Sequence, residues 1–387
     1  MKKAMFFVAL ASALGFNTAQ AVELNWKGDV RYRYESGMKD DNDSATDDHS
    51  RDRHRMRVRL GVYPWINEEL SAGLQVSTGG DGLETTSRNE TFDDLFKADQ
   101  VYFNEAFIDY HPTFFKGDVN LLLGKRDVSR TLIVEKDLVW DSDLTFEGAT
   151  LQYGKDGEGK EKDGISGAVG YYAIDENNMS STVREQDPYL IAATVSYKGD
   201  VSDFSYRVGT GYYNFVHLEN LDVQGSSDKP SRAQLATGKD FDVVEFFGSL
   251  GGDITETLPW KLYGQYAFNT AAHNSSEKLN ILNSERDAYL LGLQIGNAKA
   301  PGQWLLSGEY VSIERDSVAP ITDSDRNGGS FTNLEGFKLS AVYHVVQNMT
   351  LGLTYYNFDW KDKALVSSVA DRDDRQHLLQ ADVVVKF

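Results

Sequence analysis

Six arginines stand at alternate positions in two stretches of the chain, with polar or apolar residues between them. They are Arg31, Arg33, Arg53, Arg55, Arg57 and Arg59, and we call this set the arginine ladder. A strand turns successive side chains to opposite faces, so each stretch presents guanidinium groups on one face. Met56, Val58 and Leu60 make the opposite face of the second stretch apolar. One face therefore suits lipid and the other a water-filled lumen.

A row of guanidinium groups along a lumen would filter anions, and each group could hold a carboxylate by a fork of hydrogen bonds. Neighbouring guanidinium groups repel one another, so we predict counter-charges from Glu105 and Asp109. The alternative is a solvated wall of structural ion pairs, each of little value where exposed. Replacing Arg55, Arg57 and Arg59 with glutamine is expected to preserve the fold and to shift permeability toward cations.

A second candidate is the segment 127–144, which is rich in charges of both signs but also contains the apolar run 132–134. Apolar residues suit a segment that folds inward and packs on the wall, where it would narrow the lumen. An ordinary hairpin top is the alternative. The charged residues expected to line the lumen here are Arg126, Arg130, Glu135 and Lys136.

Alternating segments of about ten residues recur along the chain, as strands of a membrane barrel require. We count about sixteen, joined by connections that alternate between long and short. The sequence thus predicts an all-β fold, a closed transmembrane antiparallel barrel with long extracellular loops and short periplasmic turns. A barrel of this size encloses an aqueous lumen.

The N-terminal residues have the three parts of a secretory signal peptide. Lys2 and Lys3 precede the apolar run 4–16, and the small residues Ala19 and Ala21 mark a cleavage site. We therefore predict a signal peptide at residues 1–21 and one barrel domain at residues 22–387. The net charge of −20 argues against a nucleic-acid partner, and the chain has no cysteine for thiol chemistry.

No catalytic motif of the serine-hydrolase, zinc-protease or P-loop type occurs, so we expect no enzyme, cofactor or metal site. Residues 323–328 resemble the start of a calcium loop, but Leu334 stands where the bidentate glutamate would be needed. A barrel enzyme of the lipase or protease type is the alternative.

Residues 28–35, 53–62, 121–128 and 138–153, together with the terminal Phe387, resemble the Putative porin family of Gram-negative outer membranes. That family is related to phosphate-selective and alginate-export porins. The resemblance implies a channel for passive diffusion of small hydrophilic solutes and ions, and the arginine ladder favours anions or organic acids. A polysaccharide channel similar to the alginate-export porins is a further alternative.

The same resemblance implies a set of partners. The expected location is the outer membrane, in contact with its lipid and lipopolysaccharide, as a monomer or a homotrimer. Phe387 ends an alternating strand and looks like the signal that the barrel-assembly machinery recognises in outer-membrane proteins.

Overall fold

The computed structural model describes residues 22–40, 49–79, 87–93, 95, 97–177, 186–220, 240–272, 285–320, 332–363 and 375–387. The predicted signal peptide and the calcium-like segment 323–328 lie outside these ranges. Strands dominate the described residues. No helix among them is long and apolar enough to cross a membrane.

The strands follow one another along the chain with few other elements. They are β1 (Glu23–Asp40), β2 (His49–Asn67), β3 (Leu70–Ser77), β4 (Glu90–Thr91), β5 (Tyr102–Tyr110), β6 (Val119–Asp127), β7 (Thr145–Tyr153), β8 (Gly164–Ala173), β9 (Tyr189–Val201), β10 (Phe204–Val216), β11 (Phe241–Thr255), β12 (Leu258–Asn269), β13 (Asp287–Gly296), β14 (Trp304–Ile313), β15 (Leu334–Val346), β16 (Met349–Trp360) and β17 (Arg375–Lys386). The short helices among the described residues are η2 (Thr113–Phe115), α2 (Val128–Thr131) and η3 (Leu218–Asn220).

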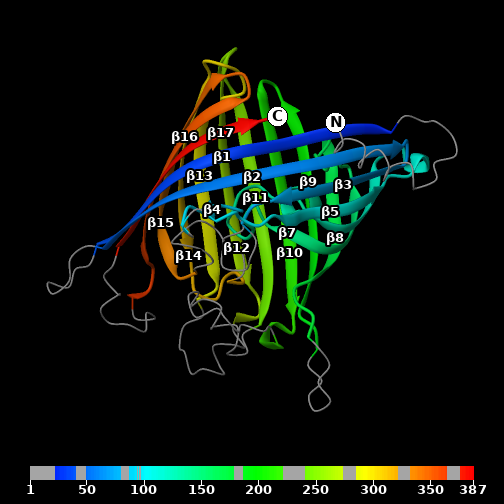
Figure 1. Cartoon of the computed structure of the whole chain (residues 1–387). Coiled ribbons are helices and arrows are strands. Elements are labelled where there is room, and N and C mark those ends of the chain that lie inside the picture. The colour runs from blue at the N-terminus through cyan, green and yellow to red at the C-terminus, as the bar shows by residue number, and fades with distance from the viewer. Residues whose placement is uncertain are drawn as a thin grey trace.

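These strands form a single closed antiparallel sheet (Figure 1). Each strand of the wall pairs with the next along the chain, and β17 pairs with β1 from Asp29↔Lys386 to Asp40↔Arg375. β3 and β4 both pair with β2, at successive positions along it, so together they occupy one place in the wall. The wall therefore has sixteen strands. The predicted antiparallel barrel of about sixteen strands is confirmed.

The connections alternate in length and define two ends of the barrel. We call one the turn end, where the connections are 68–69, 111–118, 154–163, 202–203, 256–257, 297–303 and 347–348. The other is the loop end. Phe387 lies at the turn end, which is uppermost in Figure 1, and its backbone N–H donates to Gly28 O at 3.0 Å.

The two faces of the wall differ as the alternation predicts. Outward side chains such as Val30 and Leu60 are 43% and 41% exposed, whereas the inward Arg55 is 2% exposed. Near the loop end, outward tyrosines donate to an acidic residue on the neighbouring strand, as Tyr266 does to Asp287 at 2.6 Å. Such a belt of tyrosine is typical of a lipid–water interface.

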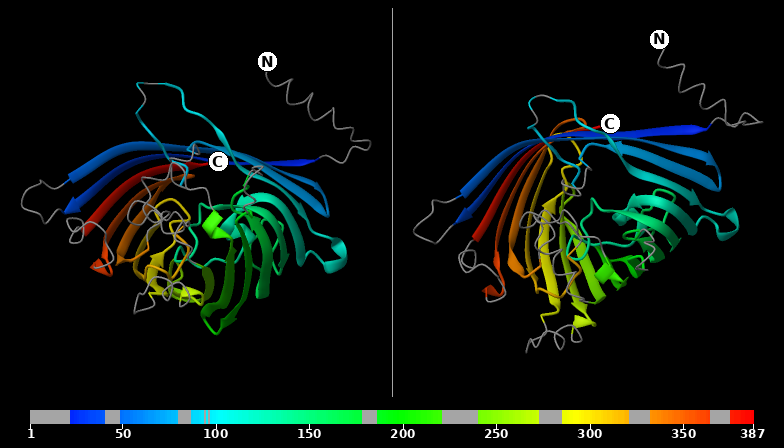
Figure 2. Two further views of the ribbon diagram at one scale, coloured as in Figure 1. Left: turned by 90° about the horizontal axis from the view of Figure 1, so that it is seen from below. Right: turned by 60° about the horizontal axis from the view of Figure 1, so that its bottom comes forward.

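The main hydrophobic cluster lies inside the barrel. Leu132, Val139 and Trp140 of segment 127–144 pack against inward residues of β8 to β16, among them Tyr213. The Trp140 ring meets the Tyr213 ring edge-on, with centroids 5.1 Å apart. Figure 2 views the barrel from the loop end and shows the strands enclosing this interior. The packing holds segment 127–144 within the lumen.

The candidate site is a narrowed lumen

Segment 127–144, called here the constriction segment, leaves the wall after β6 and crosses the inside of the barrel. Leu132 and Ile133 are fully buried. The Ile133 N–H donates to Thr194 Oγ1 on β9 at 3.2 Å. The segment therefore lies on the inner wall, as its apolar run predicted, and not at a hairpin top.

Glu135 fixes the middle of the constriction segment to the opposite wall. Arg207 on β10 donates to Glu135 Oε2 through Nε at 2.7 Å and also through Nη2. Lys261 Nζ on β12 lies 2.6 Å from Glu135 Oε1. Burial alone would raise the pKa of Glu135, but Arg207 and Lys261 outweigh it and hold the pKa below its usual value. The carboxylate is thus an ionised anchor.

The next two residues carry charges of both signs. Lys136 Nζ lies 4.4 Å from the centre of the Tyr263 ring, and burial lowers the pKa of Lys136. Asp137 Oδ2 lies 3.8 Å from Lys338 Nζ on β15, which is also 3.7 Å from Glu309 Oε1 on β14. This part of the lumen is zwitterionic, so it presents no uniform field to a solute.

The arginine ladder lies on the inner face of β1 and β2, and carboxylates from several elements neutralise it. Asp29 accepts from Arg57 Nε at 3.0 Å and from Arg59 Nε at 2.6 Å. Asp143 of the constriction segment reaches the same two arginines at 3.5 and 3.4 Å. Glu35 pairs with Arg53 and, at 3.7 Å, with Arg55.

Residues 87–89, which directly precede β4, cover part of the ladder. Arg31 donates to the Asn89 side-chain oxygen at 2.6 Å and to Ser87 O at 3.1 Å. Arg57 also reaches Ser87 O, at 3.4 Å, and Arg55 Nη2 donates to Asn89 O at 3.3 Å. Backbone and amide oxygens thus take up donors that a free ladder would offer to a solute.

The ladder is consequently buried more deeply than a solvated wall would be. The side chains of Arg53 and Arg59 are 26% and 19% exposed, the largest values among the ladder residues that form ion pairs. Replacing Arg55, Arg57 and Arg59 together would remove both guanidinium partners of Asp29, which is buried. The loss of both partners of a buried carboxylate argues against the expectation that the triple replacement leaves the fold intact, and that expectation stays a prediction.

The predicted counter-charges lie elsewhere on the inner face. Glu105 accepts from Tyr63 Oη at 2.7 Å and from the Asp127 N–H at 3.2 Å. Asp109 pairs with Arg126 Nη1 at 3.1 Å. Glu105 and Asp109 therefore belong to a separate polar cluster on β5 and β6. The carboxylates that form ion pairs with the ladder arginines are those of Asp29, Glu35, Asp143 and Asp382.

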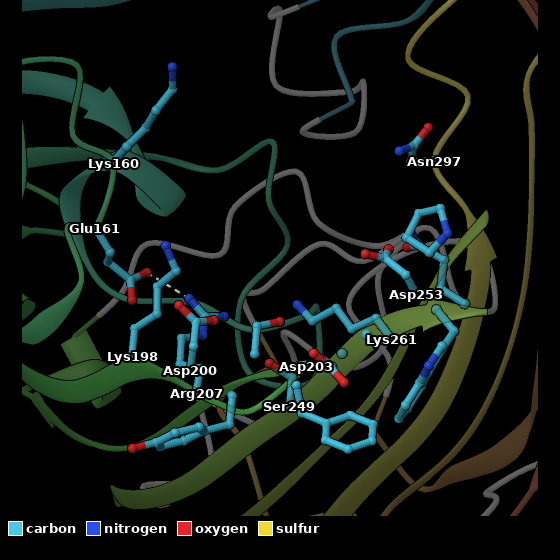
Figure 3. Close-up of a pocket in the computed structure, with 18 of the residues that line it drawn as sticks. Lys160, Glu161, Lys198, Asp200, Asp203, Arg207, Ser249, Asp253, Lys261 and Asn297 are labelled. Carbon is cyan, nitrogen blue, oxygen red and sulfur yellow. Dashed lines mark hydrogen bonds and ion pairs between the residues drawn. The ribbon is translucent and has the colours of Figure 1, made fainter. Parts of the chain in front are cut away.

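A cavity of about 920 Å³ lies between the constriction segment and the turn end. Figure 3 shows Lys198, Asp200 and Lys261 around it, with Glu161 bound to Arg207. Its lining again combines both charge signs, and Arg130 of the constriction segment belongs to it. Among the residues that the structure describes, no group of three His, Cys, Asp or Glu could hold a metal ion.

Comparisons with known proteins agree with this architecture. A family model described as "Putative porin" matches residues 23–249. A search of curated proteins finds no match. Among solved structures, the high-pH structure of Pseudomonas putida OprB is 10% identical, with a TM-score of 0.56 over 94% of each chain. An anion-selective porin from Comamonas acidovorans is 12% identical, with a TM-score of 0.50 over 95% of this chain and all of the other.

The two kinds of comparison carry different weight. At such low identity the solved structures show the shared barrel fold alone. The family model covers more than half of the chain and includes β1 to β10, the arginine ladder and the constriction segment. The chain therefore belongs to the Putative porin family.

Proposed function

We propose that this protein is an outer-membrane channel for the passive diffusion of small hydrophilic solutes and ions. The observation that carries the proposal is a closed barrel with an apolar outer face and a charged interior narrowed by its own constriction segment. A sixteen-strand barrel is wide enough to keep an aqueous path. The narrowing gives the path a size limit.

We further propose that the preference for anions or organic acids is modest and comes from two arginines. Arg53 and Arg59 keep exposed surface, whereas most of the ladder is enclosed by carboxylates and by residues 87–89. Lys136 and Asp137 add charges of opposite sign on the constriction segment. A balanced lumen of this kind favours polar and weakly charged solutes over strongly charged ones.

The outer face supports the proposed location. Its exposed apolar residues fit a lipid environment, and the tyrosine–carboxylate contacts near the loop end fit the level of lipid and lipopolysaccharide head groups. Phe387 directly follows β17 at the turn end, where the assembly machinery would bind it from the periplasm. Cleavage after Ala21 belongs to the same proposal.

Planar-bilayer recording tests the proposal directly. Purified folded protein should form stable conducting units, with a reversal potential in a salt gradient that shows weak anion preference. The same preparation should release no product from phospholipid or peptide substrates. Absence of conductance from protein whose folding is proved by heat-modifiable gel mobility would overturn the channel, and hydrolytic turnover would favour a barrel enzyme.

A further inference from the structure

The connection 154–163 at the turn end folds into the barrel, and we call it the inward turn. It is the longest connection at this end, where 202–203 and 256–257 have two residues each and 111–118 has eight. The inward turn instead reaches several parts of the wall. Glu158 pairs with Lys27 on β1 at 3.0 Å, and Glu161 pairs with Arg207 on β10 at 2.6 Å, as Figure 3 shows for the latter. It therefore spans much of the turn end.

Lys155 links the inward turn to the constriction segment. Its side chain is completely buried. The ammonium nitrogen lies 2.7 Å from Leu132 O, 3.1 Å from Arg130 O and 3.5 Å from Ser129 O. A lysine has three donors, and here the three acceptors are carbonyls at the end of α2, where a helix leaves carbonyls unpaired and partly negative.

Two further contacts to the constriction segment come from Gln152, at the end of β7 just before the inward turn, and from Gly159 within it. Gln152 Nε2 donates to Arg130 O and Thr131 O, both at 2.7 Å. Gly159 has a φ of +78°, and a Cβ there would lie 2.8 Å from Arg130 O. The close approach leaves no room for a side chain, so the inward turn supports the start of the constriction segment from the turn end.

We propose that the inward turn is an internal brace and that Lys155 is the positioning residue through which it sets the place of the constriction segment. The inference rests on the proposed channel function, because its main consequence is the conductance of the pore. With the brace closed, residues 129–132 stay against the wall and the path keeps its width. With the brace released, the constriction segment gains freedom to move.

The charges around Lys155 make this brace sensitive to pH. Glu161 and Asp156 of the inward turn favour the ammonium form, whereas Arg126 on β6 and Arg207 on β10 disfavour it. Burial is the largest effect and lowers the pKa of Lys155 to about 7, from 10.5 in water. Between about pH 7 and pH 10.5, Lys155 is therefore mostly protonated in the released state, where it is in water, and mostly neutral in the braced state, where it is buried.

The sign follows from proton linkage. As the pH rises from about 7 toward 10.5, the braced state gains stability relative to the released state. Below about pH 7 both states carry the proton and their balance stops changing. We therefore expect larger and more variable conductance at pH 6 to 7 than at pH 9.

The test compares Lys155→Met with Lys160→Met in the full chain. Met preserves the length of the side chain and removes its donors. Lys160 belongs to the same turn, but its side chain is 70% exposed. Lys155→Met should raise the single-channel conductance and abolish its change between pH 7 and 9, whereas Lys160→Met should keep that pH-dependent change. Original conductance and pH profile in a folded Lys155→Met variant would overturn the brace.

A thiol probe gives a readout that needs no conduction. The chain has no cysteine, so Ile133→Cys places a single buried thiol on the constriction segment, and Lys299→Cys gives an exposed reference thiol on the connection 297–303, away from the brace contacts. Labelling at residue 133, normalised to residue 299, should be at least about tenfold faster in Lys155→Met, because methionine removes all three hydrogen bonds and the loss of one alone has about that effect. Equal labelling would refute the brace.

Conductance and thiol labelling together distinguish failure of the brace proposal from failure of the channel proposal. If Lys155→Met does not fold, the pH dependence of labelling in Ile133→Cys alone decides, with slower normalised labelling at pH 9 than at pH 7 expected. A flat profile would refute the brace. A protein that shows the labelling pattern but no conductance would keep the brace and overturn the channel.

Discussion

Arg33 on β1 and Asp382 on β17 join the first and last strands of the barrel by two parallel hydrogen bonds. Arg33 Nε lies 2.7 Å from Asp382 Oδ1, and Nη2 lies 2.9 Å from Oδ2. The two side chains are 6% and 15% exposed. This planar fork closes the barrel on its inner side with a geometry that a lysine could not reproduce.

Replacing Asp382 with asparagine should weaken this closure. Loss of one partner leaves the buried Arg33 without a bidentate acceptor, and we expect the free energy of unfolding to fall by up to about 3 kcal/mol. The transition midpoint in heat-modifiable gel mobility measures the change. Lys125→Gln is the control, because Lys125 and Glu147 form an exposed pair worth less than about 1 kcal/mol. Equal midpoints for the two variants would contradict the prediction.

The contact between β1 and the C-terminal Phe387, beside the same pairing of β1 with β17, requires a glycine at position 28. A Cβ at this position would lie 2.6 Å from Arg59 O and 2.7 Å from the Phe387 ring. Gly28→Ala should therefore displace Phe387 and cost about 1–3 kcal/mol, the usual penalty of overpacking. Gly37→Ala on the same strand is the control, since its nearest atom would be 3.8 Å away. Urea unfolding in detergent micelles should separate the two variants, and a Gly28→Ala midpoint equal to that of Gly37→Ala would disprove the role of this contact.

The barrel was predictable because its signal is local. Alternation with a period of two assigns each side chain to a face, and one face of β2 could only suit lipid. The same signal places Asp29 and Glu35 on the inner face of β1, beside Arg31 and Arg33. Asp29 and Glu35 were therefore predictable as counter-charges from the alternation, and the prediction of Glu105 and Asp109 overlooked these nearer residues.

Other partners of the ladder carry no local signal. Asp143 and Asp382 are distant in the chain and meet the arginines only after the barrel closes and the constriction segment folds inward. The inward turn shows the same limit. Lys155 stands in a densely charged stretch that suggests solvent, yet its side chain is completely buried. Such contacts depend on tertiary packing between distant parts of the chain, which a local sequence pattern does not show.

The anchor of the constriction segment gives a prediction about conductance. Glu135→Gln removes the charge that holds this segment to Arg207 and Lys261, so the segment should shift and the single-channel conductance should rise and fluctuate. Glu147→Gln on the outer face is the control and should conduct as the original protein does. A folded Glu135→Gln variant with unchanged conductance would show that apolar packing alone holds the segment.

The last prediction separates the exposed arginines from the buried ones. Arg59→Gln removes a partly exposed guanidinium from the lumen, so the anion-to-cation permeability ratio should fall by up to about fivefold, the effect of one charge at about 4 Å in water. Arg55→Gln removes a side chain that is 2% exposed and pairs with Glu35. It should destabilise the barrel with little change in permeability ratio.

Reversal potentials in a salt gradient and unfolding midpoints, measured for both variants, distinguish the two roles of the ladder. Permeation depends on charge that a solute can approach, whereas buried ion pairs act mainly through the free energy of unfolding. If Arg55→Gln shifts the reversal potential as much as Arg59→Gln, the cover formed by residues 87–89 must open during permeation. If neither variant shifts it, the ladder is a structural framework, and the charges of Lys136 and Asp137 become the next candidates for selectivity.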